Sequence, residues 1–250
     1  MNKILAHPTN YTQGRVEDIE WLVVHYVGNA GTSAKNNALY FANHPKVFVS
    51  AHYTVDDIEV INCVDDTDTA YHCGTELSTP YAGTAHPYFG ICTNRNSIGI
   101  EMACIINSAG DWEMTEATQI NTIGLIIGLL DKYPNIKGII RHYDVTGKNC
   151  PEPFVRNEEY WLDFKARTED NMASMIQQIA DAAGLSVPET ITALGTLAKF
   201  ANTTNEDWEN KGSQALVDMG LISQPREGRE PVEFGEFGTV LKRFKDKFIP

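Results

Sequence analysis

The stretch RHYDVTGKNCP, residues 141–151, places a histidine and a cysteine eight residues apart, directly after an apolar run. That run, Ile136 to Ile140, is short and rich in β-branched residues, which predicts a buried strand. We therefore expect His142 where this strand ends and the chain enters a loop, with Cys150 flanking the same loop. Imidazole nitrogen and thiolate sulfur are preferred zinc ligands, and a catalytic zinc usually takes three protein ligands and one water. The pair alone is weak evidence, and a third ligand must come from elsewhere in the chain.

Length, charge and composition exclude several classes of protein. The 250 residues suffice for one substantial domain and a smaller one, and 42% hydrophobic residues is an ordinary globular composition. A net charge of −13 without a large Lys/Arg cluster argues against a nucleic-acid partner. The sequence predicts no membrane span and no signal peptide. Five cysteines, all within the first 150 residues, indicate mostly reduced, buried thiols, although one disulfide bridge remains open.

Apolar patterning and turn residues predict the order of elements before and after this stretch. We expect strands over 21–27, 50–55, 60–64 and 96–105, and helices over 35–43, 115–132 and 157–183. The apolar residues Ile120, Ile123, Ile127 and Leu130 have a helical spacing in the second helix, and Gly124 and Gly128, four residues apart, would let it approach a sheet closely. Residues 75–95 are expected to form a long surface loop that borders a substrate groove. His25 lies near the end of the first of these strands, where functional sites are commonly built.

Several short motifs, in this order and at this spacing, resemble the zinc-dependent N-acetylmuramoyl-L-alanine amidases, which include phage lysins and peptidoglycan recognition proteins. The motifs cover about residues 20–155: Val23-Val24-His25-Tyr26, Ser50-Ala51-His52-Tyr53, Tyr71-His72-Cys73-Gly74, Asn96 to Glu101, and Lys148 two residues before Cys150. Tyr71 replaces the tryptophan that is common in the family, which leaves only the wall of the groove in doubt. The resemblance implies an α/β fold with a central mixed β-sheet flanked by helices, and Zn2+ held by His25, His142 and Cys150.

The resemblance also implies roles for the residues around the metal. Zinc polarises a scissile amide carbonyl and acidifies a water, so a general base and a donor to the oxyanion are needed. Glu101 suits the role of general base if burial in its apolar strand raises its pKa, and Tyr53 is a second candidate for the residue that contacts the water. Lys148 suits the role of donor to the oxyanion. We expect His72 to line the groove. His52 alternates with Tyr53 and is expected to point to the opposite face of the strand.

Each of these residues also has a structural interpretation that involves no catalysis. The histidines could be core residues satisfied by backbone groups, Cys150 an inert buried thiol, and Lys148 a solvated loop charge. Their joint occurrence makes this set of explanations the weaker one. For Glu101 the alternative is a structural salt bridge, to Arg95 or Arg141.

The remainder of the chain predicts a helical linker over 166–187, after a catalytic domain over 1–165, and a helical module over 188–250. The pattern from Trp208 to Phe244 resembles one repeat of the surface-layer homology type, which attaches proteins to Gram-positive walls. The module is therefore expected to bind a secondary cell-wall polymer. A helical appendage for packing or dimerisation is the alternative.

Together these features predict a peptidoglycan hydrolase that cuts between N-acetylmuramic acid and the L-alanine of the stem peptide. The missing signal peptide fits an endolysin of a phage or prophage, made in the cytoplasm and released to the wall through a holin-type pore. A recognition protein that binds peptidoglycan without cutting it is the rival interpretation, and Cys150 argues against it. A cytoplasmic amidase that recycles muropeptides is the third, and it leaves an added wall-binding module unexplained.

Overall fold

The computed structural model describes residues 2–74, 86–183 and 185–190. The chain divides into two compact units, Met1–Thr168 and Glu169–Pro250. The candidate site lies entirely in the first unit. The predicted module over 188–250 falls almost wholly outside the described residues, so the expected domain boundaries remain predictions.

A mixed sheet forms the centre of the first unit, as the sequence predicts. Its strands lie in the order β1-β5-β4-β7-β3-β10 within the described residues, and only β4 and β5 pair antiparallel. The strands are β1 (Asn2–Lys3), β3 (Trp21–Tyr26), β4 (Tyr53–Val55), β5 (Val60–Asn62), β7 (Ser97–Met102) and β10 (Gly138–Arg141). The predicted strands are therefore confirmed, although most are shorter than expected.

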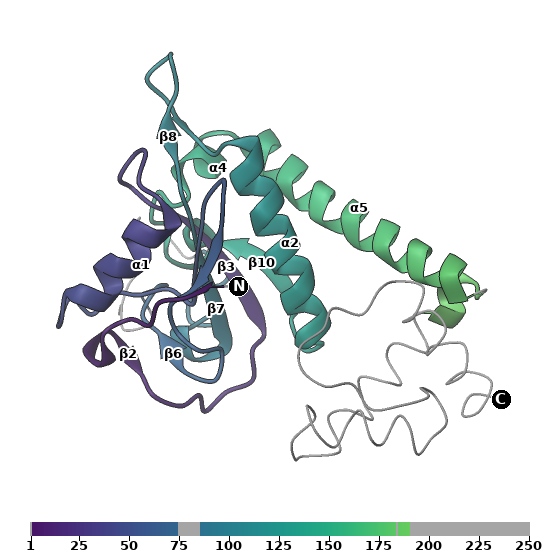
Figure 1. Ribbon diagram of the computed structural model, residues 1–250, viewed down its shortest axis with the longest axis horizontal. Coiled ribbons are helices and arrows are strands. Elements are labelled where there is room, and N and C mark those ends of the chain that lie inside the picture. Colours follow the sequence, from purple (N-terminus) through teal and green to yellow (C-terminus); the bar gives the residue numbers. More distant parts are fainter. Residues whose placement is uncertain (1, 75–85, 184, 191–250) are drawn as a thin grey trace. The chain divides into compact units, whose positions relative to one another are not determined.

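Helices cover both faces of this sheet (Figure 1). Helix α1 (Ala34–Asn43) contacts β4 and β5 on one side, and α2 (Glu116–Lys132) contacts β7, β4 and β5 on the other. Ser33 and Thr115 cap these helices, each accepting a hydrogen bond from the backbone N–H three residues on. Short helices α3 (His142–Thr146) and α4 (Glu152–Arg156) follow β10, and the long helix α5 (Glu158–Ala183) comes after them.

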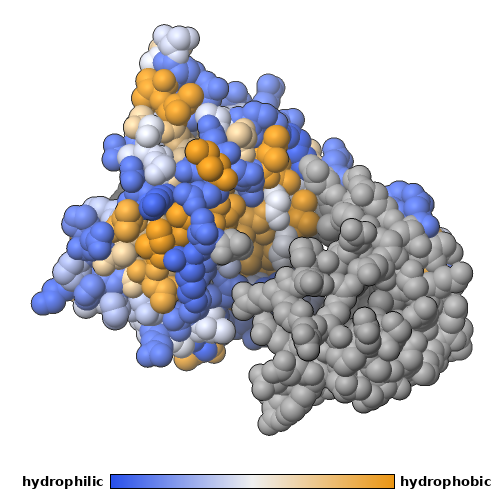
Figure 2. Space-filling view, viewed as in Figure 1, coloured by the Kyte–Doolittle hydropathy of each residue, from blue (hydrophilic) through white to orange (hydrophobic). Residues whose placement is uncertain are grey.

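The remaining elements are short. They are η1 (Pro8–Asn10), β2 (Tyr11–Thr12), β6 (Thr69–Ala70), η2 (Asn94–Asn96), β8 (Ile105–Ile106) and β9 (Trp112–Glu113). Ile105 and Ile106 are 38% and 45% exposed, and hydrophobic surface marks their hairpin at the top of Figure 2. Elsewhere in that view hydrophilic residues lie between further apolar areas, which is normal for a folded domain surface.

The alternation of side chains along β7 decides which residues reach the candidate site. Ile98, Ile100 and Met102 are fully buried in the core cluster that also contains Ile123 and Ile126 of α2. The intervening residues of β7 therefore leave the sheet on the opposite face, because successive side chains of a strand alternate. That second face carries the candidate site.

Two details of the predicted elements are wrong. His142 is the first residue of α3 instead of entering a loop. The buried face of α2 contains Thr122, Ile126 and Leu129, while Gly124 and Gly128 are exposed and bring the helix no closer to the sheet. The apolar spacing predicted the helix correctly: Ile123 lies in the core cluster and Ile127 and Leu130 pack against it, while Ile120 is 55% exposed.

Candidate active site

Three predicted ligands meet on the second face of the sheet. His25 is the fifth residue of β3, His142 begins α3 directly after β10, and Cys150 follows the loop after α3. Strands β3 and β10 are parallel neighbours, so their carboxyl ends bring the two histidines to one edge. One ligand atom from each of the three residues lies within 4.8 Å of the other two. All three side chains are buried, with at most 4% of each residue exposed.

The donor atoms of this cluster fit a bound cation. Both ring nitrogens of His142 are buried and have no hydrogen-bond partner among the described residues. A buried polar atom left without a partner is costly, so its lone pair indicates a ligand that the protein itself does not supply. Cys150 Sγ lies 3.7 Å from His25 Nδ1. Two imidazoles and one thiol are a donor set typical of a zinc site with one open position.

Burial sets the protonation of these groups in the metal-free protein. Burial, reinforced by Lys148, lowers the pKa of His142 to about 3. Burial also lowers the pKa of His25 well below its usual range, and His142, His72 and Lys148 contribute further. Both rings are therefore neutral and keep a lone pair for a ligand. Burial raises the pKa of Cys150 to about 12, so binding of a cation would have to displace the thiol proton.

Glu101 lies beside His25 because the two residues are register partners on the parallel strands β7 and β3. Its Oε2 atom is shielded from solvent and has no hydrogen-bond partner among the described residues. Burial raises the pKa of this carboxyl to about 8, and Lys148 opposes the shift. The salt bridges considered from the sequence are not formed. Arg141 pairs with Asp144 and Glu158, and Arg95 lies 4.0 Å from Glu17.

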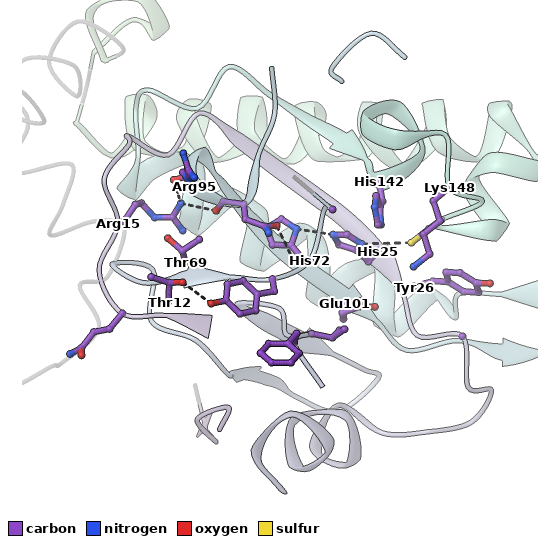
Figure 3. A pocket seen from close by; sticks show the side chains of 18 of the residues that line it. Thr12, Arg15, His25, Tyr26, Thr69, His72, Arg95, Glu101, His142 and Lys148 are labelled. Carbon is purple, nitrogen blue, oxygen red and sulfur yellow. Dashed lines mark hydrogen bonds between the residues drawn. The ribbon is translucent and has the colours of Figure 1, made fainter. Parts of the chain in front are cut away.

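Lys148 reaches the same cavity from the loop between α3 and Cys150. Gly147 ends α3 with φ 76°, a left-handed conformation that favours glycine. The chain turns there, and Lys148, which is exposed, lines the cavity together with Cys150 and Glu101. Figure 3 shows Lys148, His142, His25 and Glu101 gathered in one region of the cavity.

The cavity is much larger than the metal cluster. Its volume is about 1130 Å³, and it extends from the cluster past His72 to Arg15 and Arg95 (Figure 3). Phe48, which is 64% exposed with φ 52°, also lines it. Arg15 and Phe48 lie outside the recognised motifs, so only their place in the fold reveals them. A groove of this size accommodates a ligand with several sugar or amino-acid units.

The structure does not bring Tyr53 to this cavity. Tyr53 packs in the core on the α2 side of the sheet, and its hydroxyl donates to Asp66 Oδ1 at 2.6 Å. Lys132 and Tyr133 donate to the other oxygen of Asp66, at 2.9 and 2.8 Å. Burial alone would raise the pKa of Asp66, but these hydrogen bonds and the charge of Lys132 lower it. Tyr53 therefore belongs to a buried polar cluster behind the sheet.

His52 and His72 both lie on the side of the candidate site. His52 points away from Tyr53 as expected, but it lies on the face of the candidate site, and Tyr53 on the other face, which reverses the expected sides. His52 Nδ1 accepts from the backbone N–H of Gly99 at 3.0 Å, and Arg15 Nη2 lies 2.8 Å from its Nε2. His72 lines the cavity as expected. It also contacts His25, with 3.0 Å between His72 Nδ1 and His25 Nε2, a contact that the sequence does not reveal.

Comparison with known proteins places this fold and this site in one family. The family model described as N-acetylmuramoyl-L-alanine amidase matches residues 15–153, more than half of the chain, and the chain belongs to that family. The match contains all the residues of the metal cluster together with Glu101 and Lys148.

Individual relatives agree with this assignment. The N-acetylmuramoyl-L-alanine amidase BlyA of Bacillus subtilis (strain 168) is 34% identical over 166 residues, which is 64% of this chain and 43% of BlyA. Two solved structures, described as the catalytic domain of XlyA and as a mutant endolysin from Bacillus subtilis, each have a TM-score of 0.50 and 26% identity. Each alignment covers 66% of this chain and 96% of the solved one. The chain thus spans nearly the whole of these solved structures but less than half of BlyA.

Proposed function

We propose that this protein is a zinc-dependent hydrolase of peptidoglycan that cleaves the amide between N-acetylmuramic acid and the L-alanine of the stem peptide. The observation that carries the proposal is the buried cluster of His25, His142 and Cys150 with Glu101 beside it. The names of the relatives support the substrate and the bond. The cavity volume of about 1130 Å³ supports a substrate that extends beyond the scissile amide.

His25, His142 and Cys150 would hold the zinc ion. When bound, the ion supplies Lewis-acid polarisation of the scissile carbonyl and lowers the pKa of a water. Glu101 stands next to His25 and offers a buried carboxylate oxygen with no hydrogen bond from the described residues. We assign it the general-base role, taking a proton from the attacking water and delivering it to the leaving amine.

Lys148 is the candidate donor to the developing oxyanion. Its side chain lines the cavity beside Cys150 and carries a positive charge at the edge of a buried site. A cation placed where negative charge develops lowers the barrier without needing to move during the reaction. Tyr53 receives no role in this scheme because its hydroxyl is bound to Asp66 on the other side of the sheet.

The test combines a metal measurement with a chemical product. We expect about one zinc ion per chain by elemental analysis and, from purified cell walls, the release of new L-alanine amino termini without new reducing ends. Stoichiometric zinc without new termini would favour the rival class, a protein that binds peptidoglycan without cutting it. Cys150 favours the enzyme, because the third protein ligand completes the donor set of a catalytic zinc site.

Action at the cell wall as an endolysin is the second part of the proposal. The likeness to a solved Bacillus subtilis endolysin supports it. No helix in the part of the chain that the structure describes combines the length and apolar character needed to cross a bilayer. Expression inside a host with and without a holin should show lysis only with the holin. An amidase that recycles muropeptides in the cytoplasm would instead act on soluble fragments and leave intact sacculi uncut.

Attachment to the wall is proposed for residues 188–250, on the pattern from Trp208 to Phe244. A chain ending near residue 183 should still bind zinc and cleave soluble muropeptides, because the proposed site ends at Cys150. It should be weaker on intact sacculi, where a tethered binding module raises the local enzyme concentration. Equal activity of the two forms on sacculi, with no co-sedimentation of residues 185–250, would instead favour a packing or oligomerisation role.

A further inference from the structure

His72 connects the metal cluster to the interior of the domain. It follows β6 and is 8% exposed. Its Nδ1 lies 3.0 Å from His25 Nε2, and its Nε2 lies 3.2 Å from Ser97 Oγ on β7. The two histidine rings meet edge to face at 89°, with 5.1 Å between their centroids. Figure 3 shows His72 next to His25, with the hydrogen bond between the two rings drawn.

Ser97, at the end of this series of contacts, determines the direction of each hydrogen bond between Ser97, His72 and His25. Ser97 Oγ donates its only hydrogen to the backbone carbonyl of Thr93, an atom that can only accept. Ser97 Oγ must therefore accept from His72, which places the hydrogen of His72 on Nε2. A neutral imidazole carries one N–H, so His72 Nδ1 is an acceptor. His25 must then donate from its Nε2.

This direction leaves His25 Nδ1 without a hydrogen. Nδ1 is the atom of His25 that faces Cys150 Sγ, at 3.7 Å. We infer that His72, oriented by Ser97, is a positioning residue that selects the Nε2–H tautomer of His25 and so keeps the Nδ1 lone pair available to a cation that the cluster would hold. This inference rests on the proposed function for the identity of the metal, but the tautomer it assigns is a property of the metal-free protein.

Strand β7 is built to accept the His72 ring in this orientation. Residues 97, 99 and 101 share the face that carries the site, because side chains alternate along the strand. Gly99 leaves room for the ring: a Cβ at this position would lie 2.5 Å from His72 Cγ. One strand thus supplies the anchor Ser97, the space at Gly99 and the candidate base Glu101. The backbone N–H of His72 is fixed as well, donating to Asn94 Oδ1 at 3.0 Å.

A hydrogen bond to the second nitrogen of a ligating histidine commonly contributes about 10- to 100-fold in metal affinity. Ser97→Ala removes the group that orients His72 and changes no ligand. Ser50→Ala is a matched control, because Ser50 is equally buried and its hydroxyl also donates to a backbone carbonyl, that of Asn10 at 2.6 Å. Its hydroxyl accepts from the backbone N–H of Tyr71 at 3.1 Å, so this variant perturbs the chain beside His72 without removing a contact of the His72 ring. His72→Phe removes the acceptor and keeps a ring of similar size, while His72→Asn keeps an acceptor near the position of Nδ1.

The first readout needs no metal. With 15N-labelled histidine in the full-length, metal-free protein, NMR should show His25 with a bare Nδ1 and a protonated Nε2. In Ser97→Ala and His72→Phe we expect a mixture of the two His25 tautomers, and in Ser50→Ala the wild-type pattern. A wild-type His25 protonated at Nδ1 would overturn the inference even if the protein proved to be an active zinc enzyme. If zinc did not bind at all, the proposed function would fail. The NMR result would still decide whether His72 selects the tautomer of His25.

The second readout is zinc affinity by competition with a chromogenic chelator. We expect Ser97→Ala and His72→Phe to weaken zinc binding by about 10- to 100-fold, His72→Asn by less, and Ser50→Ala by less than about twofold. Thermal stability measured alongside separates positioning from packing. Equal loss of stability in the two serine variants with equal zinc affinity would mean that Ser97 and His72 only fill space. Should His72→Phe fail to fold, the two serine variants still decide the question.

Discussion

His25 on β3 and Glu101 on β7 are register partners in neighbouring parallel strands, so their side chains leave the sheet next to each other on the same face. The same face carries Ser97 and Gly99, against which His72 packs. A candidate metal ligand, the candidate base and the space for a positioning residue therefore depend on the register of one pair of strands. A slip of one residue would move Glu101 to the face that packs against α2.

Loss of a ligand should remove zinc. His142→Ala or Cys150→Ala leaves two protein ligands, and we expect zinc content to fall below about a tenth of the wild-type value, with activity lost in parallel. Elemental analysis and wall hydrolysis measure the two effects. Cys63→Ala is the control, because Cys63 is equally buried but contacts Thr54 and lies outside the cluster. Stoichiometric zinc and full turnover in either ligand variant would contradict the assignment.

Glu101→Gln and Lys148→Ala should separate chemistry from metal binding. We expect both variants to keep zinc and to lower kcat by roughly 10²- to 10⁴-fold, the range for a positioned base or an oxyanion donor. Steady-state kinetics on a soluble muropeptide measures this, and Lys35→Ala, an exposed lysine of α1, is the matched control. A Glu101→Gln enzyme within about threefold of the wild type would transfer the base role to another group.

The raised pKa of Glu101 predicts how the stability of the metal-free protein depends on pH. Its folded-state pKa, about 8 because of burial, lies above the ordinary value near 4.3, so the unfolded state ionises first. The stabilising contribution of Glu101 should therefore be lost as pH rises from about 4.5 to 8, whereas the buried neutral histidines His25 and His142 act in the opposite direction below about pH 6.5. Glu101→Gln removes only the first contribution, so the melting temperature of the wild type should decline relative to that of the variant over this window. Parallel curves for the two proteins would mean that the Glu101 carboxyl is not buried in this way.

Tyr53→Phe should affect stability and leave turnover unchanged. The variant removes a donor from the buried carboxylate of Asp66, which we expect to cost about 1–3 kcal/mol of unfolding free energy. Lys132 and Tyr133 still donate to Asp66, so the fold should persist. Urea denaturation and kinetics are the measurements. A large fall in kcat with unchanged stability would instead place Tyr53 at the reaction after all.

The sequence alone determined the order of the elements and the identity of the three candidate ligands. Strands of β-branched residues and helices begun by Ser33 and Thr115 follow from local preferences, which act over a few residues. His25, His142 and Cys150 were predicted to be metal ligands because their residue types and spacing match the motifs of the zinc-dependent amidases. The structure brings those three together within 4.8 Å.

Only the tertiary structure decided which face each residue occupies and what it touches. Alternation separates His52 from Tyr53, the first residue of β4, but α2, α4 and α5 decide which of the two packs into the largest core cluster, because they cover that face with apolar residues. The buried face of α2 depends in the same way on what packs against it. His72 reaches His25 from 47 residues away, and such a contact comes from the folding of strands and loops around Gly99, which no local pattern encodes.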